Sequence, residues 1–259
     1  MIRQKLVEKN VGLSTKFRWR GREISRIEGL SDAVFGFAVT LLVVSLEVPR
    51  TFTELTGAMR GFGAFAVSFA LLLVIWYNQY KFFRRYGLED NITITLTAVL
   101  LFVVLFYIYP LKFLFTWLLS GLTGAAHAAN GAAAEPMVSS REQMANLMLI
   151  FGVGYVAVFL VFALLYLHAY RQRRALDLNR LEIFDTRHDI QEALLNVCIG
   201  LLSISLVVFG GPRFAGLAGV VYLLIGVVMT IHGFLMGSRR RKLEESFTAT
   251  SPEAEAETA

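Results

Sequence analysis

The stretch from Arg26 to Pro49, RIEGLSDAVFGFAVTLLVVSLEVP, decides the fold of this chain. It joins an apolar run long enough for a membrane-spanning helix to an arginine, a serine and an aspartate at its beginning. A carboxylate at the mouth of a membrane span is costly unless it has a partner or lines a wet cavity. Asp32 therefore marks this span as a functional region.

The composition places the rest of the chain in the membrane as well. Of its 259 residues, 56% are hydrophobic and 17% are charged, a balance that a soluble domain could hold only by exposing apolar surface. Further segments are long enough to cross about 30 Å of hydrocarbon as helices. The predicted spans are 28–48, 58–81, 92–119, 144–169, 189–210 and 214–237. The sequence thus predicts an all-α, integral membrane bundle of six helices.

Basic residues sort to one side of this topology. The side that holds both termini carries most of them, in the runs Arg3 to Arg26, Lys81 to Arg85, Arg171 to Arg187 and Arg239 to Lys242. The opposite side carries only Arg50, Arg60, Lys112, Arg141 and Arg213. The positive-inside rule then predicts a multi-pass protein of the plasma membrane with both termini in the cytoplasm. The net charge of +5 follows from topology, and we expect no nucleic-acid partner.

The chain divides into three parts by composition. Residues 1–25 form a basic cytoplasmic segment, in which Phe17 and Trp19 between cations suit a position against anionic headgroups, although disorder fits equally well. Residues 26–238 hold the six spans. Residues 239–259 turn acidic and poor in apolar residues, which predicts a disordered cytoplasmic tail. Cys198 is the only cysteine, so one chain can form neither an internal disulfide nor a thiolate metal cluster.

Two stripes run along the first span when it is drawn as a helix. One stripe follows the spacing i, i+3, i+4 and i+7, which places its residues on one face. It consists of Phe37, Thr40, Leu41 and Val44. The neighbouring stripe has small side chains, which let helix backbones approach closely in lipid. It consists of Gly29, Ala33, Gly36 and Thr40. The first span is therefore suited to close packing against other helices.

The charged beginning of this span needs partners on other helices. Arg26 and Asp32 are six residues apart and lie on different faces of one helix, so they are poorly placed to neutralise each other. Polar residues of other spans lie at about the same depth from the cytoplasmic end. They are Asn78, Gln79, Asn196 and His232. We predict that these residues, with Arg26, Ser31 and Asp32, form one polar cluster, which either fixes helix register or attracts and gates ions.

The spans lack the residue patterns of a metal centre or an active site. His232 has no second His, Cys or carboxylate at metal-ligand spacing, so the sequence predicts no metal site. No nucleophile–base pair and no phosphate-cradling glycine loop is found within the spans. We therefore expect a protein that is not an enzyme and needs no cofactor.

The first span resembles that of a known family. Arg26-Ile-Glu-Gly-Leu-Ser-Asp32 is similar to the Arg-x-x-x-Phe-Ser-Asp signature of the transmembrane protein 175 family, the lysosomal and prokaryotic potassium channels, with Leu30 in place of the usual Phe. The continuation to Pro49 looks like the same family, and the six-span length matches a single-repeat prokaryotic member. The resemblance implies a homotetramer in which the first span of each subunit lines a central pore.

The resemblance also assigns roles along the predicted pore. In that family, bulky apolar side chains make the narrow part, and a threonine of the same helix contributes to selectivity. At the matching positions, Phe37, Leu41 and Val44 would form the apolar constriction and Thr40 the hydroxyl layer. In the second span, where the family often has a histidine after a tryptophan, this chain reads Trp76-Tyr77-Asn78-Gln79, so the family's polar network would here use the Gln79 amide.

The predicted function is a potassium-permeable cation channel that passes K⁺ and other monovalent cations and whose apolar constriction gates by dewetting. Two alternatives stay open. One is an ion-coupled secondary transporter with Asp32 and His232 as its relay, although the chain shows neither a duplicated half nor a span broken by Gly-Pro. The other is a non-conducting membrane scaffold, for which the small-residue stripe would serve equally well.

Overall fold

The computed structural model describes residues 17–21, 23–44, 50–52, 55, 56, 59, 62–123 and 138–256. Every regular element within this part of the chain is helical, as predicted. The elements are α2 (Arg26–Val44), α4 (Phe62–Tyr86), α5 (Asn91–Thr123), α7 (Arg141–Arg171), α8 (Arg180–Gly210), the 3₁₀ turn η1 (Pro212–Phe214), α9 (Ala215–Val221) and α10 (Leu224–Ala256).

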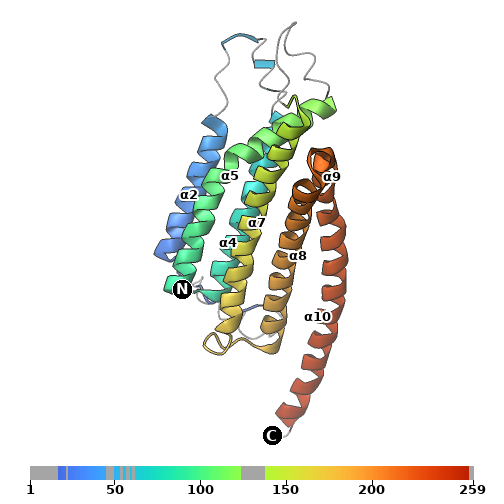
Figure 1. Ribbon diagram of the computed structural model, residues 1–259. Coiled ribbons are helices and arrows are strands. Elements are labelled where there is room, and N and C mark those ends of the chain that lie inside the picture. Colours follow the sequence, from blue (N-terminus) through green and yellow to red (C-terminus); the bar gives the residue numbers. More distant parts are fainter. Residues whose placement is uncertain are drawn as a thin grey trace.

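The long helices lie side by side as a bundle (Figure 1). Five described segments are long and apolar enough to cross a membrane, namely Phe62–Tyr86, Asn91–Leu119, Arg141–Arg171, Arg180–Gly210 and Pro212–Glu245. The helix α2 has 19 residues, about 28 Å at 1.5 Å per residue, and it contacts α4 and α5. The predicted membrane bundle is therefore present, and α2 is shorter than α4, α5, α7, α8 and α10.

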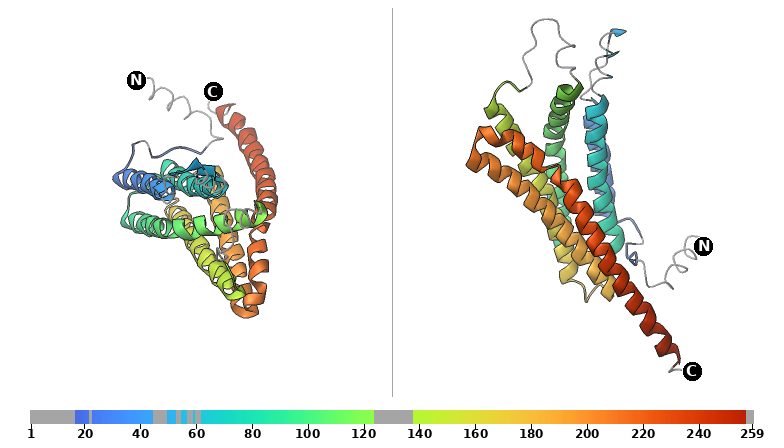
Figure 2. Two further views of the ribbon diagram at one scale, coloured as in Figure 1. Left: turned by 90° about the horizontal axis from the view of Figure 1, so that it is seen from above. Right: turned by 90° about the vertical axis from the view of Figure 1, so that its right-hand side faces the viewer.

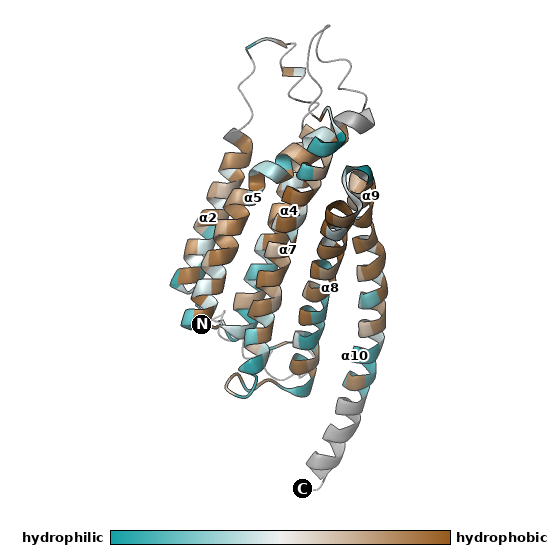
Figure 3. Ribbon diagram, in the orientation of Figure 1, coloured by the Kyte–Doolittle hydropathy of each residue, from teal (hydrophilic) through white to brown (hydrophobic). Residues whose placement is uncertain are grey.

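The helices alternate in direction, which gives the bundle two distinct ends (Figures 1 and 2). One end holds residues 17–21, the α4–α5 turn, the α7–α8 turn and the far end of α10. The other end holds the last residues of α2, α5 and α8. Apolar residues cover most of the length of the helices, and hydrophilic residues gather at the first end (Figure 3).

The region of the predicted sixth span is not one straight helix. Gly211, at φ +75°, ends α8, and the chain then turns through η1 and α9. At the end of α9 the backbone N–H groups of Tyr222 and Leu223 donate to residues three positions back, at 3.2 and 2.9 Å, and α10 begins after this break. The 3₁₀ bonds explain the break, because they tighten the turn and change the helix direction.

The helix α10 continues to Ala256 and runs obliquely beyond the ends of the other helices (Figure 2). It therefore includes most of the segment 239–259 for which the composition predicts disorder. One reason for the difference lies in the spacing of charges, because Arg240 and Glu244 form an i,i+4 ion pair at 3.2 Å. Such pairs support a helix by about 0.2–0.5 kcal/mol each.

The α4–α5 turn is tied to the end of α7 by Asp90. One carboxylate oxygen accepts a hydrogen bond from the Thr93 hydroxyl at 2.7 Å, inside the first turn of α5. The other oxygen lies 2.7 Å from Nε2 of His168. Burial acts to raise the pKa of Asp90, but the hydrogen bond from Thr93 and the neighbouring His168 outweigh it and lower the pKa.

Candidate pore helix and its anchor

The helix α2 buries one face and leaves the opposite face uncovered. The buried face follows the spacing i, i+4, i+7 and i+11, and its residues are Ser31, Phe35, Ala38 and Leu42. The apolar members belong to the larger core cluster, together with Leu72 of α4 and Leu100 of α5. Packing on α4 and α5 therefore fixes which face of α2 points away from the other helices that the structure describes.

The uncovered face carries Phe37 and Thr40 of the stripe that the sequence predicts. Phe37 is 60% exposed, Thr40 is exposed and Leu41 is half-buried, while Val44 is the last residue of α2. The Thr40 hydroxyl donates to the carbonyl oxygen of Gly36 at 3.0 Å. The hydroxyl proton is thus used within the helix, and the oxygen keeps its acceptor capacity toward the outside.

The small residues on this helix leave open space. A Cβ atom added at Gly29 or at Gly36 would meet no heavy atom within 4 Å. Asp32 and Ala33, which lie between them, are also exposed. The uncovered face of α2 is therefore partly polar, with a carboxylate at one end, a threonine near the other and Phe37 between them.

Two contacts of the predicted polar cluster join the beginning of α2 to α4. The buried amide Nε2 of Gln79 donates to the Ser31 hydroxyl at 3.0 Å, and that hydroxyl donates in turn to the carbonyl oxygen of Ile27 at 2.7 Å. The Trp76 indole N–H donates to Asp32 at 2.8 Å. The structure thus brings Ser31, Asp32 and Gln79 together at the α2–α4 contact, and it adds Trp76.

An ion pair that the sequence analysis missed completes this anchor. The Glu28 carboxylate lies 3.1 Å from a guanidinium nitrogen of Arg84, and the two side chains are only 6% and 16% exposed. Glu28 lies three and four residues before Ser31 and Asp32, so all three positions share one side of the helix. That spacing is the signal in the sequence that indicates a place for Glu28 in the anchor.

Arg26 and Asn78 do not join the anchor. Arg26 is exposed and has no hydrogen-bond or ion-pair partner among the residues that the structure describes. Asn78 is half-buried, and its amide donates back to the carbonyl oxygen of Val74 at 2.9 Å. The prediction that they join the cluster was wrong, since Arg26 contacts no polar partner among the described residues and the Asn78 amide bonds within its own helix.

Asn196 belongs to α8 and His232 to α10, and these two helices lie on the opposite side of the bundle from α2 (Figures 1 and 2). Asn196 of α8 accepts a hydrogen bond from the Tyr155 hydroxyl at 2.5 Å. His232 of α10 has its Nε2 atom 3.1 Å from Nδ1 of His188. The prediction that they join Asp32 was wrong, because equal depth along the bundle does not place two helices side by side.

The segment before α2 is tied to the beginning of α8. Asn179 and Glu182 form a capping box there, with Asn179 accepting from the Glu182 backbone N–H at 2.8 Å. The same Glu182 carboxylate lies 2.7 Å from a guanidinium nitrogen of Arg20 and accepts the Arg18 backbone N–H at 2.9 Å. The hydrogen bond to Glu182 raises the pKa of Arg18. The segment before α2 is therefore held against the beginning of α8 by Arg18 and Arg20.

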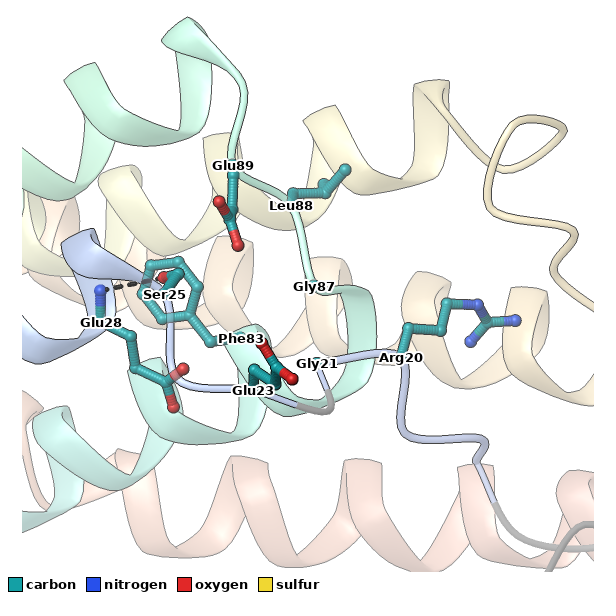
Figure 4. Close-up of a pocket in the computed structure, with 9 residues that line it drawn as sticks. All are labelled: Arg20, Gly21, Glu23, Ser25, Glu28, Phe83, Gly87, Leu88 and Glu89. Atoms are coloured by element: carbon teal, nitrogen blue, oxygen red, sulfur yellow. Dashed lines mark hydrogen bonds between the residues drawn. The ribbon is translucent and has the colours of Figure 1, made fainter. Parts of the chain in front are cut away.

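A pocket of about 330 Å³ opens between this segment and the α4–α5 turn (Figure 4). The Ser25 hydroxyl at its edge accepts the backbone N–H of Glu28 at 3.1 Å and so caps α2. Gly87 has φ +59°, and a Cβ atom there would lie 3.0 Å from the backbone nitrogen of Gly21. Glycine at this turn therefore allows the segment before α2 to approach α4 closely.

Comparisons with known proteins agree with the motif. Residues 26–107 match the family model described as the endosomal/lysosomal potassium channel TMEM175. A protein of Marivirga tractuosa named as a potassium channel is 41% identical over 246 residues, which cover 93% of this chain and 98% of that relative. The chain belongs to the TMEM175 family. The family resemblance of the first span is thereby confirmed.

Solved structures support the fold of this TMEM175 chain. A crystal structure of a variant of the potassium channel MtTMEM175, in complex with a nanobody–MBP fusion, aligns with a TM-score of 0.76 at 40% identity. The alignment covers 87% of this chain and 99% of that one. A TMEM175 homologue from Chamaesiphon minutus, described as a lysosomal potassium-selective channel, aligns with a TM-score of 0.52 at 23% identity, over 80% and 96% of the two chains. The second match supports the fold alone.

The named relatives are channels, which catalyse no reaction. This confirms the prediction that the TMEM175 chain is not an enzyme. Among the residues that the structure describes, no group of three or more His, Cys, Asp and Glu side chains is arranged to hold a metal ion. The candidate site therefore consists of the uncovered face of α2 and the polar contacts that join α2 to α4.

Proposed function

We propose that this chain is a K⁺-permeable channel of the plasma membrane in which α2 of each subunit lines the pore of a homotetramer. Both termini lie in the cytoplasm, and other monovalent cations also pass. The single observation that supports this best is the uncovered face of α2. A face with Asp32 at one end and Thr40 near the other is a poor match for hydrocarbon, and it suits a water-filled axis between subunits.

In this proposal, Phe37, Leu41 and Val44 form an apolar constriction around the axis. Such a constriction gates by dewetting, because water leaves a narrow apolar passage and an ion must shed part of its hydration to enter. Weakly hydrated K⁺ pays less for this than Na⁺. Thr40 sits among these residues, and its hydroxyl oxygen offers partial replacement for the lost water.

Flux measurements on purified protein in liposomes test the constriction. We expect Phe37→Ala to raise K⁺ flux and to reduce the preference for K⁺ over Na⁺. Phe234→Ala is the matched control, since Phe234 of α10 is also exposed but lies far from α2, and it should leave both quantities unchanged. Wild-type flux and selectivity in Phe37→Ala would refute the assignment of the constriction.

Cross-linking tests the central axis independently of conduction. Cys198→Ser gives a cysteine-free background, because Cys198 is the only cysteine. In that background, Phe37→Cys should form disulfide-linked dimers on mild oxidation, since side chains that line one axis face each other. Phe234→Cys should not. A protein that runs as a monomer with Phe37→Cys unlinked would exclude a pore along α2.

The alternatives make different predictions. A coupled transporter would show a fixed ion ratio in reversal-potential measurements, and a scaffold would show no flux. The relay considered for a transporter, Asp32 with His232, finds no support in the structure. His232 contacts His188 at 3.1 Å on the α8–α10 side, whereas Asp32 contacts Trp76 at 2.8 Å on the α2–α4 side.

A further inference from the structure

Several carboxylates at the end of the bundle that holds the α7–α8 turn have cationic partners. These pairs are Glu28 with Arg84, Glu182 with Arg18 and Arg20, Asp189 with Lys81 and Arg85, and Asp185 with Arg240. The α7–α8 region carries a second set of cations that has no carboxylate partner among the described residues. It consists of Arg171, Arg173, Arg174, Arg180 and Arg187. Asp177, in the turn itself, lies 3.6 Å from Arg18, so this set gives the turn an excess of positive charge.

Two of these arginines are held on the same tyrosine. The guanidinium carbon of Arg173 lies 4.8 Å from the centre of the Tyr170 ring, and that of Arg187 lies 5.2 Å from it. Arg187 donates to the Tyr170 hydroxyl from Nε at 3.0 Å and from Nη2 at 2.5 Å. Arg173 donates from Nη1 to the Tyr170 carbonyl oxygen at 3.2 Å.

This arrangement has the properties of an anion site. Two like charges beside one ring repel each other, and an anion between them would remove the repulsion. Each guanidinium has five N–H donors in a planar fork, so Arg173 and Arg187 keep donors beyond those that Tyr170 uses. Phosphate oxygens match that fork and accept two parallel hydrogen bonds. The chemistry therefore favours a phosphate group.

The position of the cluster points to a lipid as the source of the phosphate. Both α7 and α8 are candidate membrane spans. Leu164 is exposed on α7 seven residues before Arg171, and Leu194 is exposed on α8 seven residues after Arg187. Residues seven apart share a helix face. Arg171 and Arg187 therefore end exposed apolar faces, at the depth where headgroups lie and where tyrosine is favoured, and Arg173 follows Arg171 by two residues in the α7–α8 turn.

We propose that Tyr170, Arg173 and Arg187 bind the phosphate of an anionic phospholipid. Arg171 and Arg180 attract the negatively charged membrane surface without a fixed geometry, as basic residues near a membrane do. Zwitterionic lipids bind less well, because their ammonium group offsets the phosphate charge. The proposal requires only that α7 and α8 span the membrane, and it is independent of the pore assigned to α2.

Native mass spectrometry of the full chain in detergent measures this directly. Wild-type protein is titrated with phosphatidylglycerol and with phosphatidylcholine of the same acyl chains, and we expect tighter binding of phosphatidylglycerol. Replacing Arg173 and Arg187 together by glutamine should weaken phosphatidylglycerol binding about tenfold. Tyr170→Phe removes no charge but takes away the hydroxyl acceptor of Arg187, and it should weaken binding severalfold. The folding of each variant is verified by its elution volume and melting temperature.

A charge-matched control separates a built site from general attraction. Arg239→Gln with Arg241→Gln removes two exposed charges from α10 and should leave phosphatidylglycerol binding unchanged. Equal losses in the two double variants, or no loss in Tyr170→Phe, would overturn the proposal. Soluble glycerol phosphate is added as a competitor and should not displace the lipid, because it lacks the acyl chains. Displacement would show that the site takes a free phosphate and would overturn the lipid assignment.

Discussion

Replacing Glu28 with glutamine should loosen the attachment of α2 to α4 by about 3 kcal/mol. The Glu28–Arg84 pair is closed at 3.1 Å with both side chains largely buried. Removing one partner of a buried ion pair leaves the other charge without compensation, which costs about 3–5 kcal/mol. The lower end applies here, because Arg84 keeps its hydrogen bond to the carbonyl oxygen of Gly21 at 3.0 Å.

Thermal unfolding of the purified protein in detergent measures this effect. One kcal/mol shifts the melting temperature of a chain of roughly this size by about 2–4 °C, so Glu28→Gln should lower it by about 6–12 °C. Adding Arg84→Gln removes the second charge and should cost much less than the sum of the two single substitutions. Purely additive losses, or a melting temperature unchanged by Glu28→Gln, would refute the role of the pair.

Two further predictions concern polar contacts near the same end. Ser31→Ala leaves the buried Gln79 amide without its partner and should destabilise the protein by about 1–2 kcal/mol, measured by the same thermal unfolding assay. Replacing Gln79 by leucine in the Ser31→Ala protein removes the unpaired amide, so the double variant should lose less stability than Ser31→Ala alone. Asp90 has a lowered pKa in the folded protein, so its contribution to stability is present above its unfolded value near 3.8 and is lost as the pH falls through the folded value. Asp90→Asn should therefore lower the melting temperature at pH 7 and flatten its decline below about pH 4, and an unchanged acid profile would contradict this.

The sequence predicts how deep each residue lies along the bundle, but it does not predict which helices are neighbours. The spans, their alternation and the two faces of α2 follow from hydropathy and from a period of 3.6 residues, which are local properties. Asn196 and His232 match Asp32 in depth, yet they lie on helices at the other side of the bundle. Helix neighbourhood depends on packing between distant segments, and no local pattern in one sequence specifies it.

The same distinction explains the break before α10 and the missed ion pair. The hydropathy of residues 214–237 is continuous, so a single span was the natural prediction, whereas the break depends on backbone hydrogen bonds at Tyr222 and Leu223. Glu28 was visible in the motif. Its importance depends on Arg84 at the end of α4, and a single sequence does not show which of several cytoplasmic cations a carboxylate contacts.

The anchor constrains how α2 can move. Glu28, Ser31 and Asp32 contact Arg84, Gln79 and Trp76, which lie along about the last three turns of α4. A rotation of α2 on its own would break a buried ion pair and strand a buried amide, at a cost of several kcal/mol. In the proposed channel, a change in pore width is therefore cheaper when α2 and α4 move together, or when Phe37 changes its rotamer on a fixed helix. If the Phe37 rotamer alone changes the width, Glu28→Gln would lower the melting temperature and leave K⁺ selectivity unchanged. Phe37→Ala would then change K⁺ selectivity and leave the melting temperature unchanged.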